Sequence, residues 1–264
     1  MPTTSDPGPL ARRSAESLLL PAVTLLLLLA GWVLAVRATG TKVFPHPMQV
    51  LDGMLELMRS GVLLRYAADS LLRVGLGFGL AVLVGLVLGM GMGLYPMVAL
   101  ALGPVVQFLR PISPLAWVPI AILFFGVGDK AAVALIFLAA SLPLALHTTG
   151  AMATVPAIYL NAGRNFGLSP LRLFFRVLLP AAMPQLLVGL RIALWVSWQV
   201  VVAAEMIAVD SGLGYMIVDA RNAGKRYDLV VAGMLLIGGI GLLLDTGIRK
   251  MESLRWVRWG FREE

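Results

Sequence analysis

The sequence contains no cysteine, only two histidines and few charged residues. The absence of cysteine from all 264 residues excludes disulfides, thiolate metal ligands and thiol nucleophiles. His46 and His147 are far apart among apolar neighbours without a second ligand nearby, so neither predicts a metal site. Charged residues make up 13% of the chain, whereas soluble domains usually contain about 25%. This shortage of charge argues against a soluble domain.

Motifs for catalysis and for nucleotide or nucleic-acid binding are also missing. The sequence has no HExxH motif, no carboxylate pair at catalytic spacing and no nucleophile with a plausible histidine base. Its glycine-rich run is not followed by the Gly-Lys-Ser/Thr ending of a phosphate loop. No basic and aromatic pattern indicates an RNA- or DNA-binding module. We therefore expect no enzyme active site, metal site or cofactor in this chain, and no nucleic-acid partner.

Apolar residues are abundant instead. They make up 59% of the chain, and the mean hydropathy is +0.89. This composition predicts an all-α integral membrane protein, since helices satisfy their own backbone hydrogen bonds in lipid. The formal net charge of +7 then indicates basic residues at the cytoplasmic ends of spans and near lipid headgroups.

The hydropathy pattern predicts six membrane-spanning helices within a single transmembrane domain, residues 18–250. An interfacial helix at 48–58 precedes the second span, and prolines interrupt the third. The expected spans are 18–36, 70–94, 96–125, 131–149, 183–208 and 229–248. Residues 1–17 are expected to be a disordered tail, and 251–264 a basic tail. Between the last two spans we expect a polar loop.

Glycines spaced four apart occur along the second span. Small residues at this spacing allow close helix packing in membranes. We therefore expect a packing face formed by Gly75, Gly79, Gly85, Gly89 and Gly93.

An even number of spans places both termini on one side of the membrane. That side would carry Arg12, Arg13, Arg164, Arg172, Arg176 and the basic tail, which predicts that it is cytoplasmic. The segment between the fourth and fifth spans would then be the major cytoplasmic loop.

This cytoplasmic segment, residues 154–184, has the features of two short helices. Gly167 supplies a stop, and Ser169-Pro170 supplies a new helix start. On the first helix one face carries Tyr159, Ala162, Gly163 and Phe166. The segment is either an amphipathic loop on the membrane surface or a docking surface for a protein, and periodicity alone does not decide.

Charged residues inside the spans are functional candidates because each is costly in lipid. In the fifth span Arg191, Trp195, Trp198 and Glu205 share one face. Arg191 either faces the bundle interior or snorkels to the headgroups, and Glu205 either forms a structural pair or lines a pathway. The tryptophans are more often packing anchors than ligand contacts. Asp245 and Arg249 are most simply a local ion pair.

The cytoplasmic segment also resembles a known motif. Asn161-Ala162-Gly163 is followed after three residues by Gly167 and, nine residues later, by Val177-Leu178-Leu179-Pro180. This spacing is similar to the Glu-Ala-Ala loop motif of binding-protein-dependent ABC importer permeases. Asn161 replaces the usual glutamate, and Gly163 replaces the second alanine.

Further stretches resemble the nitrate/sulfonate/taurine branch of that family, over about residues 40–262. They are the run from Arg110 to Pro119, Phe125–Asp129, Val202–Met206, Ser211–Tyr215 and Leu242–Asp245. The resemblance implies a non-catalytic permease in the bacterial inner (cytoplasmic) membrane. It also implies partners: a second permease copy, two cytoplasmic ATPases that bind ATP and magnesium, an extracytoplasmic substrate-binding protein and membrane lipid.

The resemblance also implies roles for named residues. The coupling contact with the ATPase is expected at Tyr159, Asn161, Ala162, Gly163, Phe166, Gly167, Leu179 and Pro180. The translocation path is expected at Arg110, Trp117, Arg191, Trp195, Trp198 and Glu205. The solute would be a small anion or zwitterion, such as taurine, an alkanesulfonate, nitrate or bicarbonate. The alternative is an ion-coupled secondary transporter that uses Glu205 and Arg191 as its relay.

Overall fold

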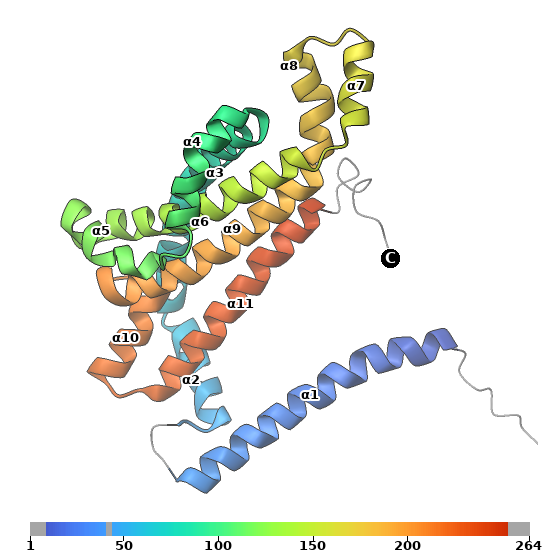
Figure 1. The fold of residues 1–264 in the computed structure, drawn as a ribbon. Coiled ribbons are helices and arrows are strands. Elements are labelled where there is room, and N and C mark those ends of the chain that lie inside the picture. Colours follow the sequence, from blue (N-terminus) through green and yellow to red (C-terminus); the bar gives the residue numbers. More distant parts are fainter. Residues whose placement is uncertain (1–8, 41–43, 253–264) are drawn as a thin grey trace, which may run out of the picture.

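The computed structural model describes residues 9–40 and 44–252, and every regular element in that part is a helix (Figure 1). Five described helices are long and apolar enough to cross a membrane, and a bent helix pair can form a sixth span. The predicted all-α membrane fold is thereby confirmed. The basic tail from residue 253 and the side chains of Arg12 and Arg13 lie outside the described residues.

Helix α1 (Pro9–Thr39) is separate from the main bundle and reaches it through α2 (Pro47–Arg59) (Figure 1). It begins before the predicted start at residue 18, so the expected disordered tail is wrong from Pro9 onwards. Its apolar window, from Leu19, has no buried residue in the single chain. Near its end, the Trp32 indole donates a hydrogen bond to the Pro45 carbonyl (3.2 Å).

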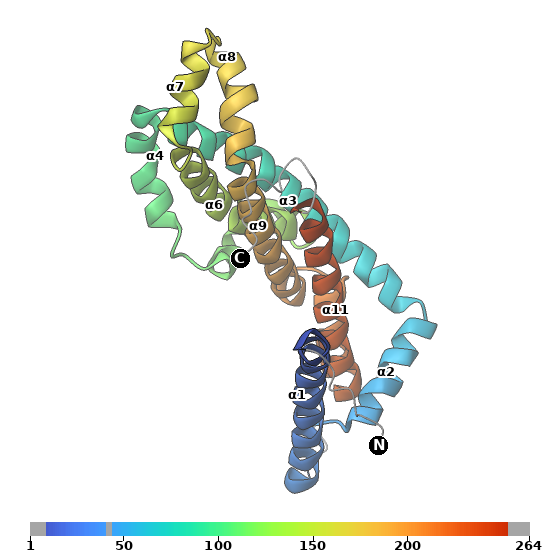
Figure 2. The ribbon, with the colours of Figure 1, turned by 90° about the vertical axis from the view of Figure 1, so that its right-hand side faces the viewer.

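The core of the bundle consists of α3 (Val62–Leu94), α6 (Asp129–Ala153) and α9 (Leu179–Ala208) (Figure 2). The predicted start of the second span at about Ser70 was wrong, because the helix begins at Val62, about two turns earlier. Helix α6 is the most buried of the spans, since it lies between α3 and α9. Its many alanines allow this, because small side chains let two neighbours approach one helix closely.

Glycines on α3 make the α3–α6 contact possible. A Cβ atom on Gly89 would collide with the Ala145 carbonyl and the Thr148 side chain, and one on Gly85 would lie 3.0 Å from the Ser141 carbonyl oxygen. Gly77 and Gly93 have similarly close neighbours on α6. The predicted packing face is confirmed at Gly85, Gly89 and Gly93. It was wrong at Gly75 and Gly79, where a Cβ would meet nothing within 4 Å.

The third span is broken, as the prolines predicted. Helix α4 (Pro96–Leu109) ends before Pro111, and a short 3-10 turn, η1 (Pro114–Trp117), leads into α5 (Val118–Phe125). The two halves are bent by 89°. Proline causes the break because it has no N–H to donate to the preceding turn and its ring crowds that turn.

The segment predicted to be cytoplasmic, residues 154–184, includes a hairpin at one end of the molecule (Figures 1 and 2). Its helices are α7 (Ala157–Asn165) and α8 (Pro170–Leu173), and α8 continues through a π turn, η2 (Phe174–Leu178), into α9. The Leu179 N–H bonds the carbonyl of Phe174, five residues earlier. A π turn fits at this place because Pro180, which follows it, has no backbone N–H to donate to a carbonyl of the preceding turn. The predicted fifth span, starting at 183, was therefore too short, because α9 begins at Leu179. The helical stretch continues back to Pro170, with a bend where α8 and η2 lead into α9 (Figure 1).

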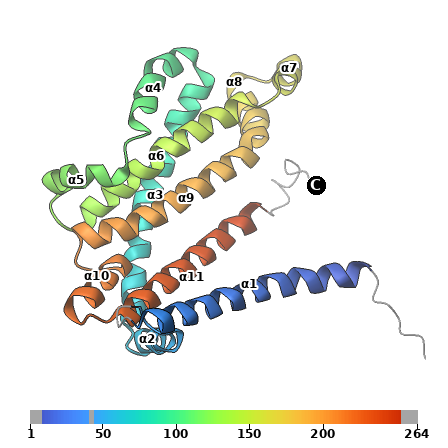
Figure 3. The same cartoon turned by 60° about the horizontal axis from the view of Figure 1, so that its bottom comes forward.

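At the opposite end, α10 (Leu213–Ala223) lies between α9 and α11 (Tyr227–Glu252) (Figure 3). A polar loop was predicted there, and the helix corrects this prediction. Arg226 joins α11 to α2 by ion pairs to Asp228 and Glu56, both at 2.7 Å. The hydrogen bonds with Asp228 and then Glu56 raise the pKa of Arg226.

Candidate functional site

Gly163 lies on the inner side of the hairpin, between α7 and α8. It is buried, and a Cβ atom there would collide with Cδ1 of Leu173. Gly167, with φ of +73°, makes the left-handed turn that ends α7, as predicted. Gly163 therefore faces the hairpin itself, whereas its neighbour Ala162 is exposed.

The outer surface of the hairpin is rich in exposed aromatic and basic side chains. Phe166 is 86% exposed and Tyr159 is 49% exposed, and both lie where the hairpin extends beyond the bundle (Figure 1). Asn161 and Ala162 are exposed as well, whereas Leu179 is half-buried and Pro180 exposed at the start of α9. Exposed large aromatics on a projecting element are typical of a protein-contact surface.

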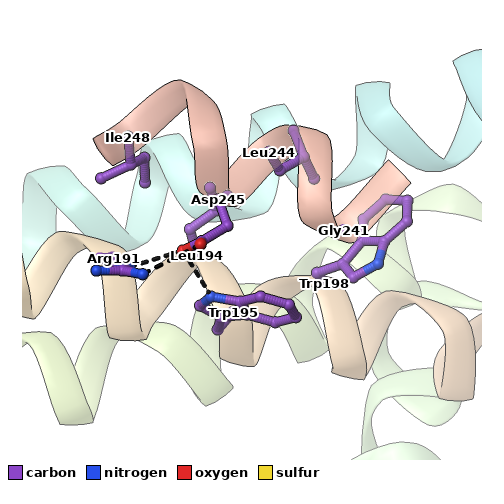
Figure 4. Close-up of a pocket in the computed structure, with 8 residues that line it drawn as sticks. All are labelled: Arg191, Leu194, Trp195, Trp198, Gly241, Leu244, Asp245 and Ile248. Atoms are coloured by element: carbon purple, nitrogen blue, oxygen red, sulfur yellow. Dashed lines mark hydrogen bonds and ion pairs between the residues drawn. The ribbon is translucent and has the colours of Figure 1, made fainter. Parts of the chain in front are cut away.

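Arg191 forms an ion pair with Asp245 across the α9–α11 contact (Figure 4). Its Nε donates to Asp245 Oδ1 at 2.6 Å, and Trp195 Nε1 donates to the same oxygen at 3.2 Å. Arg249 adds a third donor at 2.8 Å. Arg191 is therefore held by a partner on the neighbouring helix. The predicted Asp245–Arg249 pair is present, and it is part of this larger cluster.

Glu205 lies in a second cluster near the far end of α9. It is fully buried and accepts hydrogen bonds from three donors: Ser70 Oγ (2.7 Å), Arg73 Nη1 (2.7 Å) and the Gly214 backbone N–H (2.9 Å). Arg73 also pairs with Asp129 and donates to the Ser211 carbonyl. This buried pair connects α3, α9, the start of α6 and the start of α10.

The two clusters do not form a single line of titratable groups. Arg191 and Glu205 share a face of α9, as predicted, but Arg191 pairs with α11 and Glu205 pairs with α3 and α10. Trp198 lies between them and donates its indole N–H to the Ile237 carbonyl (3.2 Å). In the chain as described, each charge has its partner within its own cluster.

Arg110 and Trp117 lie apart from both clusters, at the bend of the broken span. They line a cavity of about 240 Å³ together with apolar residues of α6 and α9. Of the six predicted path residues, Arg110 and Trp117 share this cavity. Arg191, Trp195 and Trp198 line a small pocket between α9 and α11 (Figure 4), and Glu205 is fully buried.

The chain matches the family of binding-protein-dependent transport system inner membrane components over residues 81–252. It belongs to that family. Membership and the membrane-spanning helices together identify a multi-pass inner membrane protein, an ABC importer permease of the nitrate/taurine branch.

Several relatives of this permease carry names that state a solute. The nitrate import permease protein NrtB of Synechocystis is 36% identical over 256 residues, covering 94% of this chain and 92% of the relative. The taurine transport system permease protein TauC of Escherichia coli is 35% identical, with coverages of 92% and 90%. The bicarbonate transport system permease protein CmpB of Synechocystis is 38% identical over 70% of this chain and 66% of the relative.

Solved structures support the fold of the permease. A chain of the methionine ABC transporter MetNI, in an inward-facing conformation, superposes with a TM-score of 0.64 at 19% identity. The match covers 79% of this chain and 98% of that one. A chain of an amino acid ABC transporter gives a TM-score of 0.61 at 17% identity, with coverages of 77% and 96%.

Sequence reasoning missed Arg73, Ser70 and Asp129 as partners of Glu205. Arg73 falls inside the predicted second span, so the cost of charge in lipid was a signal that could have singled it out. Its pairing with Glu205 could not have been found, because the two residues are 132 positions apart. The partnership of Arg191 with Asp245, 54 positions apart, was missed for the same reason.

Proposed function

We propose that this chain is the permease subunit of an ATP-driven importer for a small anionic or zwitterionic solute. Two copies would form the translocation path. Two cytoplasmic ATPases, which would bind the ATP and magnesium, would drive it, and a soluble binding protein would deliver the solute outside. The path would alternate between inward-facing and outward-facing states as packed helices rotate against one another.

The projecting hairpin is the observation that carries this proposal. Its surface combines exposed Tyr159 and Phe166 with the basic residues Arg164 and Arg172, and it is continuous with α9 through η2. A contact made on the hairpin would therefore be transmitted directly to a helix of the membrane core. The family motif falls on this element, so we assign the ATPase contact to Asn161, Ala162 and their exposed neighbours.

The solute class is supported by the relatives and by the charge of Arg110. Nitrate, taurine and bicarbonate, named for the relatives, are all small and carry an oxyanion group. Arg110 lines the cavity at the bend of the broken span, and a cationic side chain along a path favours anions. Both termini would be cytoplasmic if the bent pair forms the sixth span.

The alternative, an ion-coupled transporter with Arg191 and Glu205 as relay, is not favoured. A relay needs groups that exchange protons or ions along a path. Here the two residues belong to separate clusters, each with its own ion-pair partner. Family membership also points to an ATPase-driven subunit.

The decisive experiment is reconstitution in liposomes. The chain is co-expressed with its ATPase and its binding protein. Liposomes with this assembly should take up radiolabelled taurine or nitrate only when ATP is present on the side of the membrane where the ATPase lies. The chain without the ATPase should give no uptake above that of empty liposomes. Solute uptake by the isolated chain would refute the proposal.

A substitution on the hairpin tests the coupling surface. Ala162→Trp should reduce ATPase co-purification at least tenfold, because about 1.4 kcal/mol of lost contact lowers affinity by that factor. The permease should still migrate as the same oligomer in size-exclusion chromatography. Ala68→Trp, at an exposed alanine of α3 at the other end of the molecule, is the matched control and should retain the ATPase. Full retention by Ala162→Trp would contradict the assignment.

A further inference from the structure

The cavity at the bend of the broken span has one charged side chain among its described lining residues, Arg110. Its volume is about 240 Å³. The other lining residues are apolar or proline: Leu109, Ile112, Pro114, Trp117, Leu138, Ala139, Leu142, Pro143 and Val196. Pockets for drug-sized ligands are usually about 300–1,000 Å³, so this one suits a smaller solute.

The cavity lies at the middle of the membrane span. Its α6 residues, Ala139 to Pro143, are at the centre of the helix Asp129–Ala153. Its α9 residue, Val196, is close to the centre of Leu179–Ala208. Arg110 is therefore held at a depth where neither rim of the membrane is within easy reach of its side chain.

Arg110 has no acidic partner among residues 9–40 and 44–252. None of the ion pairs between described side chains includes it, and its side chain is exposed in the single chain. By contrast, Arg191 is paired with Asp245 and Arg73 with Glu205. A guanidinium at this depth must face water or an anion, since exposure to lipid is costly.

The backbone around Arg110 is irregular at the same depth. Helix α4 ends at Leu109, and the chain turns by 89° before α5. Irregular backbone is tolerated inside a membrane only where it is buried in protein or lines an aqueous cavity. Broken helices at the midplane are also a common way to build solute sites in other transporters.

We propose that Arg110 and Trp117 form an anion subsite of the translocation path, which accepts the oxyanion group of the solute in transit. The guanidinium fork donates two parallel hydrogen bonds to two oxygens of a nitrate, sulfonate or carboxylate-like group. The apolar walls and the Trp117 ring contact the rest of the solute. This inference rests on the proposed function and deepens it, because it names the group that the path recognises.

The absence of native cysteine allows a direct test on the full-length chain in membranes. A single Leu142→Cys substitution places a thiol in the cavity wall. An anionic reagent, 2-sulfonatoethyl methanethiosulfonate, should label it about tenfold faster than the trimethylammonium-ethyl reagent of opposite charge, after correction for intrinsic reactivity. Excess sodium nitrate or taurine should slow this labelling, and sodium gluconate should not.

Adding Arg110→Gln should abolish the preference for the anionic reagent, and Arg110→Lys should retain part of it. Arg65→Gln, which removes the same charge from an exposed site near the start of α3, is the control and should leave the preference unchanged. Ile112→Cys provides a second position in the cavity wall in case Leu142→Cys folds poorly. Equal labelling by the two reagents, or no labelling at either position, would overturn the inference.

Uptake by the complete assembly separates this inference from the proposed function. Loss of ATP-dependent uptake in the unmodified assembly would count against the proposed function and leave the labelling result standing. If the unmodified assembly transports taurine or nitrate, Arg110→Gln should lower the rate of uptake about 10–100-fold, as expected for a lost charged hydrogen bond. Unchanged uptake in that variant would refute the subsite alone.

Discussion

At the scale of residues, Glu205 is the most constrained side chain in the bundle. A buried carboxylate is tolerated only with a paired charge and satisfied lone pairs, and Arg73, Ser70 and the Gly214 N–H supply both. Gly212 is part of the same fit, because a Cβ atom there would collide with the Glu205 carboxylate. Glycines at 212 and 214 thus let the start of α10 approach the carboxylate.

Removing both partners of this pair should cost less stability than the two single removals added together. We expect Arg73→Met or Glu205→Gln alone to lower the free energy of unfolding by about 3–5 kcal/mol, because the remaining group loses its partner in a buried site. The double variant should be less destabilised than the sum of the two. Denaturant titration in mixed micelles measures each value.

The exposed pair of Arg226 and Glu56 provides the comparison. These side chains are 43% and 55% exposed, so Glu56→Gln should cost less than about 1 kcal/mol. If the Arg73 and Glu205 effects were strictly additive, the two groups would act independently and our account of the cluster would fail.

At this scale the sequence predicts local turns and helix starts, but it does not predict the partners of charged side chains. The spacing of the cytoplasmic motif located the hairpin, the Gly167 turn and the start at Pro170, because these depend on local backbone chemistry. The partners of Arg191 and Glu205 depend on which helices become neighbours, and one sequence does not contain that information. Arg110 and Trp117 line the same cavity because they are close in sequence and near the same break.

At the scale of elements, the α3–α6 contact depends on which glycines face α6. The four-residue spacing predicted close packing, but two sets of glycines on α3 could satisfy it. Only the rotation of the helix in the bundle decides between them, and Gly77 rather than Gly75 or Gly79 faces α6. Helix α10 was missed for a related reason: its buried face, which includes Leu213 and Met216, packs on α9 and α11 among polar residues typical of a loop.

Replacing glycine with alanine on α3 should have opposite effects on stability at glycines that face α6 and at glycines that do not. Gly89→Ala should destabilise the bundle by about 1–3 kcal/mol, because the new methyl would collide with the backbone of α6. Gly79→Ala, with no atom near its Cβ position, should be neutral or stabilise by up to about 1 kcal/mol through helix propensity. Thermal midpoints in detergent should separate the two variants. Equal midpoints would contradict the packing described.

At the scale of the whole molecule, the bent pair α4–α5 decides the topology. If it crosses the membrane, the chain has six spans and both termini lie on one side; if it re-enters, they lie on opposite sides. The prolines predicted the break, but hydropathy alone does not distinguish these arrangements. We favour the crossing. The hairpin and both termini then lie on the same side of the membrane, and their basic residues are those expected on the cytoplasmic side.

Reporter fusions test this topology. Green fluorescent protein fused to either terminus should fluoresce in the cytoplasm, and alkaline phosphatase inserted at Gly224 should be active outside. The expected pattern is fluorescence at both termini and phosphatase activity only at the insertion between α10 and α11. A fluorescent fusion at one terminus only would show that the bent pair re-enters.

Helix α9 connects three sites of the molecule, and this has a mechanical consequence. It has 30 residues and is about 45 Å long, at about 1.5 Å per residue. The hairpin is attached at its start through η2, the Glu205 cluster lies near its end, and Val196, in the cavity wall, lies between them. A tilt of about 5° around a central pivot would displace the two ends of α9 by roughly 2 Å in opposite directions, given that length. The helix would then act as a lever, opening one side as it closes the other, while a solute at the pivot hardly moves.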